Sequence, residues 1–596
     1  MRFGIFYEHQ LPRPWAEGDE QRLIGDALEQ VELADRVGFD AVWAVEHHFL
    51  EEYAHSSASE VFLAACSQRT QRMRLGFGIV ALPPGYQHPA RVAEKASMLD
   101  LVSGGRVELG TGETSSGIEL GGFDVDRASK REQWEEALDV VTRMFVEEPF
   151  AGWEGRFVSM PPRNVVPKPS QRPHPPLWVA CSRRETIRLA AERGIGALSF
   201  SFIEPEEAKQ WVDEYYEIIS SERCVPAGFA VNPNVAVVLP MMCHPDESEA
   251  IARGIDGAHF FGYALAHYYV FGEHRPGRTS IWEEFLARRD DVGFARSVIT
   301  ADDSPLGIKV LQQGLGSLRG AIGTPAQVTD LVRRYEAAGV DQVIFVMQAG
   351  RNRHEHIIES IELAGSAVLP QFAAQADSVE QAKAQRLAPA IVAALARRAP
   401  ARESDPTYVV APGDSGAGPG AAGAGTGARV SADRSSGAAD GNSAGTRPAA
   451  RTRIAASLQR RGEMAFEAGV RRASDRQLER TIGSALGLRT MFSAMARAFV
   501  PERSNGFRGE IQYVLRRGAG TSQRWIVAID GSGARSRPGG ASEPRLTLAL
   551  SVADFVRMAA RELDPMAAVI GGRLILTGDL ELAGRLGEMF GQPPRF

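Results

Sequence analysis

The chain has 596 residues, a formal net charge of −7, 44% hydrophobic residues and 24% charged residues. Its length exceeds what one domain usually holds, and its composition is ordinary for a soluble protein. The negative charge and the absence of a dense Lys/Arg stripe argue against nucleic-acid binding. Four widely spaced cysteines without metal-ligand spacing indicate free thiols in a reducing cytoplasm, not disulfides or a metal site. The sequence also predicts no signal peptide and no membrane span, because no run of about 18 apolar residues occurs.

Residues 1 to about 370 alternate between strand and helix patterns. The eight expected strands are Arg2–Phe6, Ala41–Val45, Arg74–Val80, Arg106–Gly110, Leu177–Ala180, Ala197–Phe200, Asn234–Leu239 and Gln342–Val346. The clearest helix patterns are Ala90–Leu101, Ser129–Val146, Glu185–Arg193, Ala326–Ala338 and His354–Leu369. Eight strand–helix units predict an α/β fold of the (β/α)8, or TIM-barrel, type. An open doubly wound sheet is the alternative, but it would normally show a Gly-rich GxGxxG turn after the first strand, which is absent here.

Two long connections interrupt this alternation. The first, Phe150–Pro176, is rich in proline and suggests an excursion before the fifth strand. The second, His244–Gly323, is far longer than an ordinary strand-to-helix connection and carries many aromatic residues. It is expected to form either a lid over an apolar pocket, or a helical pair that packs its own core or a dimer surface.

The pattern changes beyond Phe372. A possible helix, Val379–Arg398, leads into Ala411–Ala450, a stretch dominated by Gly, Ala and Ser that cannot bury enough apolar surface to order itself. Structured patterns resume near Arg451. We therefore expect a barrel over residues 1–372, a helix and flexible linker over 373–450, and a small α+β domain over 451–596.

A polar cluster, Glu46-His47-His48-Phe49, follows the second expected strand. In α/β barrels the catalytic residues lie at the C-terminal ends of the strands. Two imidazoles beside a carboxylate are suited to act as a base, as hydrogen-bond donors or as metal ligands. A structural hydrogen-bonding role is the plainer alternative for a histidine at a strand end.

Four separated segments share one family resemblance. They are Glu46–Phe49, Gly76–Pro83 with His88–Arg91, Leu99–Arg106 with Gly110–Gly112, and Gly339–Val343. In this order and spacing they resemble the bacterial luciferase-like flavin monooxygenases. Chance agreement over four separated segments is unexpected, so this resemblance extends over residues 1 to about 370.

The resemblance implies a barrel that binds reduced FMN at the C-terminal ends of its strands. The flavin would react with dioxygen and oxidise an apolar substrate, such as a long-chain aldehyde or another lipid. A separate flavin reductase would supply the reduced flavin, and a homodimer is the expected assembly. Two alternatives stay open: a related barrel that uses a deazaflavin for hydride transfer, and a catalytically idle barrel in a lipid carrier.

The resemblance also implies roles for single residues near the flavin ring. His47 matches the family's active-site histidine, and His48 is assigned to the substrate pocket or to a structural role. Gly78 and Ile79 match a non-proline cis peptide beneath the flavin, with a strand bulge as the alternative for Gly78. Phe200 matches an aromatic residue of the flavin or substrate pocket, with core packing as its alternative.

The flavin phosphate is expected at the start of the helix that follows the strand Leu177–Ala180. Gly110 and Thr111 belong to the matching segment after the fourth strand, and Ser182 matches a family phosphate ligand at a helix start. Cys181 is also assigned to the cofactor-binding residues, although the family has a glutamate at this position. No residue is assigned to a metal.

Glu113 departs from the family pattern, because the luciferases have an arginine there that contacts the phosphate. A carboxylate beside a phosphate is unfavourable unless a cation neutralises it. Arg183 or Arg184 is expected to supply that charge.

A second resemblance covers about residues 474–596. It rests on Asn505–Tyr513, Asp530-Gly531, Leu546–Phe555 and the Gly-Gly-x-Leu-x-Leu-x-Gly-Asp pattern of Gly571–Asp579. These segments resemble the sterol carrier protein 2 fold. That fold implies a five-stranded sheet with helices around an apolar tunnel for sterols or acyl chains, so this domain is expected to bind lipid.

Overall fold

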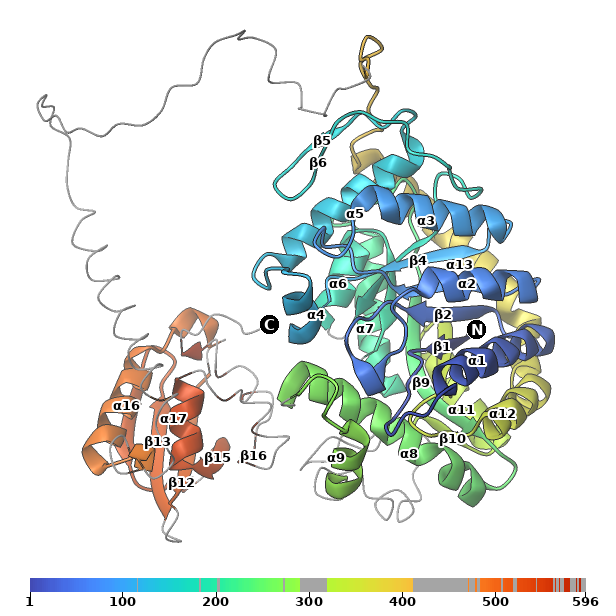
Figure 1. The fold of residues 1–596 in the computed structure, drawn as a ribbon. Helices are drawn as coiled ribbons and strands as arrows, with labels where there is room; N and C mark the ends of the chain where they lie inside the picture. Colours follow the sequence, from blue (N-terminus) through green and yellow to red (C-terminus); the bar gives the residue numbers. More distant parts are fainter. Residues whose placement is uncertain are drawn as a thin grey trace, which may run out of the picture. The chain divides into compact units, whose positions relative to one another are not determined.

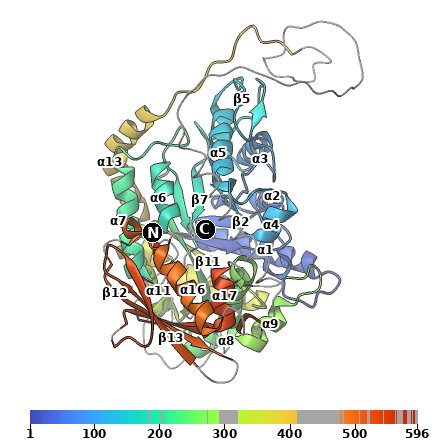
Figure 2. The same ribbon diagram turned by 90° about the vertical axis from the view of Figure 1, so that its left-hand side faces the viewer.

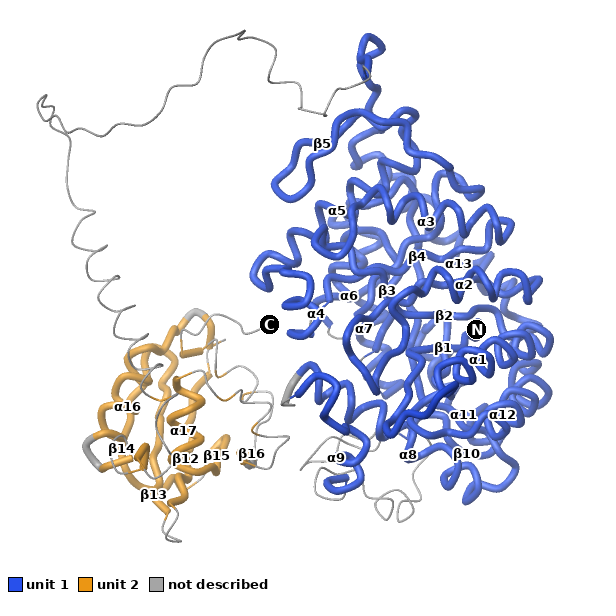
Figure 3. Tube along the Cα trace, viewed as in Figure 1, with its two compact units in different colours: residues 1–311, 316–421 blue, residues 312–315, 422–596 orange. Residues whose placement is uncertain are grey.

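The structure is a computed structural model, and its described residues fall into two compact units (Figure 3). In the first unit it describes residues 1–114, 116–181, 184–200, 204–271, 274–289 and 319–410. In the second it describes residues 470, 477–479, 483–504, 507–517, 522–542, 544–560, 563, 568, 573–578, 582, 586, 589 and 590. The predicted tether Ala411–Ala450 lies outside these residues, and so do residues 451–469 of the small domain expected over 451–596.

Eight parallel strands of the first unit close into a barrel (Figure 1). They are β1 (Arg2–Tyr7), β2 (Ala41–Val45), β3 (Arg74–Ile79), β4 (Val107–Thr111), β7 (Leu177–Cys181), β8 (Gly196–Ser199), β9 (Val235–Cys243) and β11 (Gln342–Val346). Strand β9 pairs with both β8 and β11, and β11 pairs with β1, so the sheet has no open end within this set. The predicted (β/α)8 barrel is confirmed, and the open doubly wound sheet is ruled out.

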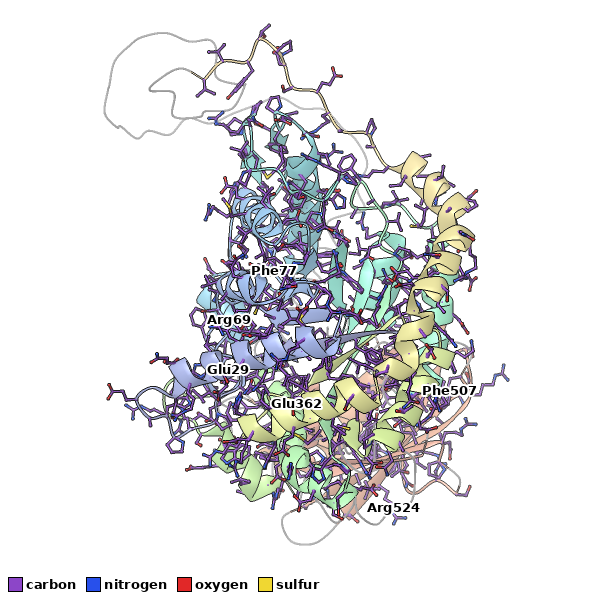
Figure 4. The ribbon with its side chains drawn as sticks, turned by 90° about the vertical axis from the view of Figure 1, so that its right-hand side faces the viewer. Glu29, Arg69, Phe77, Glu362, Phe507 and Arg524 are labelled. Carbon is purple, nitrogen blue, oxygen red and sulfur yellow. The ribbon has the colours of Figure 1, made fainter. Side chains whose placement is uncertain are left out.

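Helices surround the barrel and bury its outer face. They are α1 (Asp19–Val37), α2 (Ser59–Arg69), α3 (Pro89–Val102), α5 (Lys130–Val146), α6 (Arg184–Glu192), α7 (Pro205–Ile219), α8 (Glu247–Ala266), α11 (Pro325–Ala337) and α12 (His354–Ala367). Alternate strand residues such as Phe3, Ile5 and Phe77 pack against them in one continuous core. Figure 4 labels Phe77 within this core, and Glu29 of α1 and Glu362 of α12 on two neighbouring outer helices.

The other strand face fills the barrel interior. Trp43 and Trp178 meet there edge to face, with ring centroids 5.3 Å apart. Two glycines leave room for these indole rings. A Cβ on Gly76 would lie 2.2 Å from the Trp43 ring, and one on Gly196 would lie 2.4 Å from the Trp178 ring. The lower half of the barrel is therefore solidly packed, which leaves its C-terminal end for chemistry.

Both long connections form structure of their own. The proline-rich excursion carries the hairpin of β5 (Trp153–Glu154) and β6 (Ser159–Met160), and between them lies a short turn. The aromatic insertion forms α8, then the π-helix η2 (His267–Phe271), then α9 (Ile281–Arg288). The insertion ends at β10 (Ala321–Gly323), which pairs with the C-terminal residues of β9, Met241–Cys243.

The helix expected at Val379–Arg398 begins nine residues earlier, as α13 (Pro370–Arg397). It lies beside α7 (Figure 2). Lys383 donates to Asp341 at 2.8 Å and Arg2 donates to Asp377 at 2.7 Å, so the helix is bonded to the N-terminal ends of β1 and β11. Through these contacts α13 belongs to the barrel unit.

The second unit contains one five-stranded sheet and helices. Its strand order is β14 (Ala534–Pro538), β13 (Ser522–Ile529), β12 (Gly509–Arg516), β15 (Leu546–Ser551) and β16 (Leu574–Gly578). The helices α16 (Ala485–Arg497) and α17 (Val552–Ala559) supply Phe492 and Phe555, whose rings stack 4.9 Å apart. Phe492 also stacks on Trp525 of β13 at 4.8 Å. The predicted α+β domain with a five-stranded sheet is confirmed.

Candidate active site

His47 lies at the C-terminal end of β2 and is only 7% exposed. Its backbone N–H donates to Ser56 O at 3.0 Å, and the preceding Glu46 N–H donates to Ile79 O at 3.0 Å. The backbone of this segment is therefore bonded both to the neighbouring strand β3 and to the following loop. This fixes the direction in which the imidazole leaves the strand.

Glu119, from the short helix α4 (Gly117–Gly122), holds one side of the His47 ring. Its Oε1 lies 3.0 Å from His47 Nδ1 and accepts the His48 backbone N–H at 3.0 Å. Its Oε2 accepts the Thr114 hydroxyl at 2.9 Å. Three donors thus hold a carboxylate that is 1% exposed, and that carboxylate orients the imidazole.

Glu8 faces the other side of the ring. It follows β1 directly and is 2% exposed. Its Oε1 accepts the Tyr53 hydroxyl at 3.0 Å, while its Oε2 lies 3.8 Å from His47 Nε2. Among the described residues, Oε2 has no hydrogen-bond partner. His47 therefore lies between two buried carboxylates, one bonded to it and one at longer range.

These neighbours set the charge of the site. Burial alone would lower the pKa of His47, but Glu119 and Glu8 raise it to about 9. Burial raises the pKa of Glu8 to about 7, although His47 and the Tyr53 hydroxyl oppose that rise. Burial also acts to raise the pKa of Glu119, but the charge and hydrogen bond of His47 hold it below the usual range. Near neutral pH the site therefore holds an imidazolium that can donate a proton.

His48 belongs to a different environment. Its Nε2 lies 3.3 Å from Glu46 Oε1, and Glu46 also accepts from Lys95 Nζ at 3.2 Å. Its ring lies edge-on to Phe123, with centroids 4.8 Å apart, and close to Phe49, which is 52% exposed. The side chain thus borders a partly open aromatic group and has no contact with the carboxylates that hold His47.

The expected non-proline cis peptide is not present. Within the described residues every cis peptide bond precedes a proline, and the Gly78–Ile79 bond is not among them. The pairing of β2 with β3 instead skips one residue: Ala44 is paired with Phe77 and Val45 with Ile79. Gly78 therefore lies at a register shift, which is the bulge that was the alternative for this glycine.

Gly110 and Thr111 have structural contacts. A Cβ on Gly110 would lie 2.1 Å from Phe77 O, so only glycine permits this approach of β3 and β4. The Thr111 hydroxyl donates to Trp178 O at 3.1 Å and accepts from Trp134 Nε1 at 3.1 Å. Both positions shape the strand end, and the Thr111 hydroxyl is already engaged by α5 and β7.

Cys181 points away from the barrel interior. Its side chain lies in the core between strands and helices, where Sγ donates to Val179 O at 3.3 Å and burial raises the pKa of the thiol. Only its backbone therefore remains for a cofactor contact. Ser182 and Arg183 lie outside the described residues.

The cations that neutralise Glu113 come from α5, and the expectation for Arg184 is wrong. Arg131 donates to both oxygens of Glu113, at 2.9 and 2.8 Å, and Lys130 lies 3.6 Å away. Arg184 is instead bonded to Glu214 of α7 at 2.8 Å. Burial acts to raise the pKa of Glu113, but Arg131 and Lys130 hold it below the usual range.

Phe200 lies at the end of β8 and is half-buried. Its ring meets Phe6 of β1 edge to face, with centroids 5.1 Å apart. Phe6 and Val45 are also the side chains nearest to the missing Cβ of Gly78, each at 3.1 Å. The structure thus groups Phe200 with Gly78 inside the barrel.

The aromatic insertion covers the His47 side of the barrel end. Tyr53, which bonds Glu8, has its ring 5.6 Å from Phe261 of α8 and 6.4 Å from Tyr268 of η2. Burial and the charges of Glu119 and Glu8 raise the pKa of Tyr269 of η2. The contacts with Tyr53 agree with the lid, while Phe260 of α8 packs on Trp282 and Phe285 of α9, with ring centroids 5.0 and 5.8 Å apart, as expected for a helical pair with its own core.

Sequence reasoning missed Glu8, Tyr53, Glu119 and Tyr269. Glu8 carries one signal, a charged residue directly after a barrel strand. The other three lie in the 3-10 helix η1 (Glu51–Tyr53), the short helix α4 and the aromatic insertion, and only the fold brings them together. Among the described residues, no group of three or more His, Cys, Asp or Glu side chains could hold a metal ion. In the part of the chain that the structure describes, no helix is long and apolar enough to cross a membrane.

Comparison with known families decides the assignment. Residues 1–342 match the family model described as luciferase-like monooxygenase, which is more than half of the chain. The chain belongs to the luciferase-like monooxygenase family. Residues 496–591 match the SCP-2 sterol transfer family, so the chain joins a luciferase-like barrel to a sterol-carrier domain.

The chain is similar to the following two relatives and one solved structure. The oxygenase component of the flavin-dependent trigonelline monooxygenase of Acinetobacter baylyi is 23% identical over 62% of this chain and 96% of its own length. Limonene 1,2-monooxygenase of Rhodococcus erythropolis is 40% identical over 24% of this chain, and the match spans only 36% of that protein. The structure of monooxygenase RslO1 from Streptomyces bottropensis aligns with a TM-score of 0.48 and 25% identity, over 62% of this chain and 100% of that one.

Proposed function

We propose that this protein is a flavin-dependent monooxygenase that uses reduced FMN and dioxygen to oxidise an apolar substrate. The observation that carries the proposal is the buried His47 imidazole, whose Nδ1 lies 3.0 Å from Glu119 Oε1 at the C-terminal end of the strands of a luciferase-like barrel. Relatives named as trigonelline and limonene monooxygenases support this reaction class.

The residues present suit a flavin ring. Glu8 Oε2 lies 3.8 Å from His47 Nε2 and is buried without a hydrogen-bond partner among the described residues. Buried polar atoms without partners are costly, and a bound polar heterocycle or water would satisfy them. We assign His47, the backbone of Gly78 and Ile79, and Gly110 to the ring. When bound, reduced FMN would supply the electrons that activate dioxygen.

We assign the flavin phosphate to the ends of β4 and β7. Ser182 and the backbone of Cys181 are the proposed contacts, with Arg131 and Lys130 as the nearby cations. Because Arg131 and Lys130 carry two positive charges against the one negative charge of Glu113, this group keeps one positive charge before any anion binds. A phosphate would therefore bind here through that charge as well as through hydrogen bonds.

Side chains of this protein would then supply the proton and keep water away from the reacting molecule. His47 Nε2 is the ring nitrogen that does not contact Glu119, so it is free to donate a proton to a reacting oxygen. The aromatic rings of the insertion and Phe49, Phe123 and Phe200 would form the apolar surroundings of the substrate. With His48 they make up the proposed substrate pocket.

The sterol-carrier domain suggests what kind of substrate is used. We propose that it binds a lipid and presents it, or a product of it, to the barrel on the same chain. A flexible connection would raise the local concentration of one site at the other, to roughly the millimolar range if it spans the distance. The relative named as an oxygenase component suggests that a separate reductase supplies the flavin.

We further propose a cytoplasmic homodimer. The four cysteines are free and buried, which suits a reducing compartment. Neighbouring helices α2 and α3 expose four large apolar side chains, Val61, Met98, Leu101 and Val102. Such a patch suits a protein interface, and light scattering would measure the mass.

The test is to titrate the purified protein with reduced FMN and then mix it with dioxygen while recording absorbance. A transient species distinct from oxidised and reduced FMN, absent in His47→Ala, is expected. Failure to bind reduced FMN would reject the proposal, and binding of a reduced deazaflavin would then identify a hydride-transfer enzyme. If neither cofactor bound while lipid did, the protein would be a lipid carrier.

A further inference from the structure

We propose that Glu8 is the proton-exchanging partner of His47, so that the site holds a two-step proton relay instead of a lone imidazole. The inference rests on the proposed function, because it concerns how His47 recovers its proton during turnover. It assigns a role to Glu8, a residue to which neither the sequence motifs nor the family resemblance pointed.

The two oxygens of Glu8 have unequal surroundings. Oε1 accepts the Tyr53 hydroxyl at 3.0 Å, which fixes the carboxyl group. Oε2 is buried, has no hydrogen-bond partner among the described residues, and lies 3.8 Å from His47 Nε2. That distance is too long for a hydrogen bond, but a rotation of the imidazole or one small bridging group would close it.

A buried carboxylate with a free oxygen is costly unless it binds a proton or a partner. Titratable groups face Glu8 from four elements: His47 after β2, Tyr53 in η1 (Glu51–Tyr53), Glu119 in α4 and Tyr269 in η2. Burial and Glu119 favour the neutral carboxyl, while His47 and Tyr53 favour the carboxylate. These opposing influences place the pKa of Glu8 at about 7, where a carboxyl exchanges protons readily.

The relay conserves protons and moves no electrons. The imidazolium Nε2–H bond breaks as its proton passes to an oxyanion that develops on the reacting molecule. The neutral imidazole then takes the Oε2 proton of Glu8, which leaves a carboxylate. Solvent protonates that carboxylate before the next cycle. Glu119 keeps Nδ1 protonated throughout, so only Nε2 exchanges.

The experiment follows the His47 ring by NMR in flavin-free protein with ¹³C-labelled histidine, using His47→Ala to assign the resonance. In the unmodified protein we expect a main titration near pH 9 and a smaller inflection near pH 7 from Glu8. In Glu8→Gln the inflection should vanish and the pKa of His47 should fall by about one pH unit or more. Glu8→Asp should retain the inflection, and Glu20→Gln, an exposed carboxylate at His55, should change nothing.

An unchanged His47 titration in Glu8→Gln would overturn the relay. If that variant fails to fold, Tyr53→Phe serves instead: loss of the Tyr53 hydrogen bond should move the inflection to higher pH, and no movement would again overturn the relay. Because these titrations need no flavin, they stand whether or not oxygenation occurs. If oxygenation occurs but its pH–rate profile is the same in Glu8→Gln, the relay is wrong and the proposed function survives.

Discussion

At the scale of single residues, the chemistry of His47 depends on carboxylates from distant parts of the chain. Glu119 and Glu8 approach opposite sides of the ring, and together they outweigh the burial that would otherwise favour its neutral form. His48 belongs to the same sequence motif, but its ring lies beside Glu46, and it reaches Glu119 only through its backbone N–H. The two adjacent imidazoles therefore have different charged surroundings.

We expect His47→Ala to lower oxygenation by about 10²–10⁴-fold, the usual contribution of a positioned acid or base. The fold should persist, since the ring's partners are two side chains and no backbone group. His48→Ala is the matched control and should cost less than about tenfold. Turnover measured at saturating reduced FMN, with circular dichroism as the check on folding, gives the comparison. Near-normal turnover in His47→Ala would remove this residue from the mechanism.

The raised pKa of His47 also predicts how stability depends on pH. Its folded pKa of about 9 exceeds the 6.5 of a free imidazole. The protonated ring therefore stabilises the fold fully below about pH 6.5, and this contribution is lost as pH rises through 9. The difference corresponds to about 3 kcal/mol. Urea unfolding at several pH values should show this loss in the unmodified protein and not in His47→Gln; equal slopes in both would contradict it.

At the scale of elements, the aromatic insertion is attached to the barrel by the residues that directly follow the histidine motif. Glu51 accepts from His274 at 3.0 Å and from Gly277 N at 2.7 Å. Glu52, fully buried, accepts the first backbone N–H groups of α9, those of Ile281 and Trp282, each at 2.9 Å. A carboxylate at a helix N-terminus is favourable, so the segment that follows the histidines also positions α9.

Glu52→Ala should release α9 locally. Two N–H groups would lose their acceptor, and we expect hydrogen exchange of the Ile281–Arg288 amides to rise by about tenfold or more. Glu283→Ala, an exposed change in the same helix turn, should leave that exchange unaltered. Equal exchange in the two variants would show that Glu52 does not hold α9.

At the scale of the whole molecule, the barrel unit includes the helix that follows the last strand. Arg397 of α13 donates to Cys224 O at 2.9 Å, and Arg402 beyond it donates to Gly152 O at 2.6 Å. The barrel unit therefore includes residues near 400 and does not stop at 372. The Gly- and Ala-rich stretch begins only after these contacts.

Limited proteolysis with elastase, which cleaves after small residues, should cut first between Ala411 and Ala450 and leave two folded pieces. A variant lacking residues 411–450 should survive the same exposure longer, because its cleavable stretch is gone. First cuts inside the barrel or inside the five-stranded sheet would contradict a flexible connection. Mass spectrometry of the early fragments identifies the sites.

Local sequence patterns predicted the helices and strands well. They did not predict the contacts between residues that are far apart along the chain. The runs at Ala41–Val45 and Gln342–Val346 match β2 and β11 residue for residue, because buried parallel strands are continuous apolar runs. The role of Arg184 was mistaken because its partner Glu214 lies on another helix. Likewise the bulge at Gly78 depends on how β2 pairs with β3, which no local pattern records.

By itself, the sequence determined the barrel and the sterol-carrier domain and predicted a role for His47, because period, turn residues and family motifs are local properties of a chain. Only the tertiary structure placed Glu8 and Glu119 on opposite sides of that histidine, 39 and 72 residues away along the chain. The reason is physical: a pKa is set by burial and by charges within a few ångströms. Those neighbours exist only once the barrel has closed.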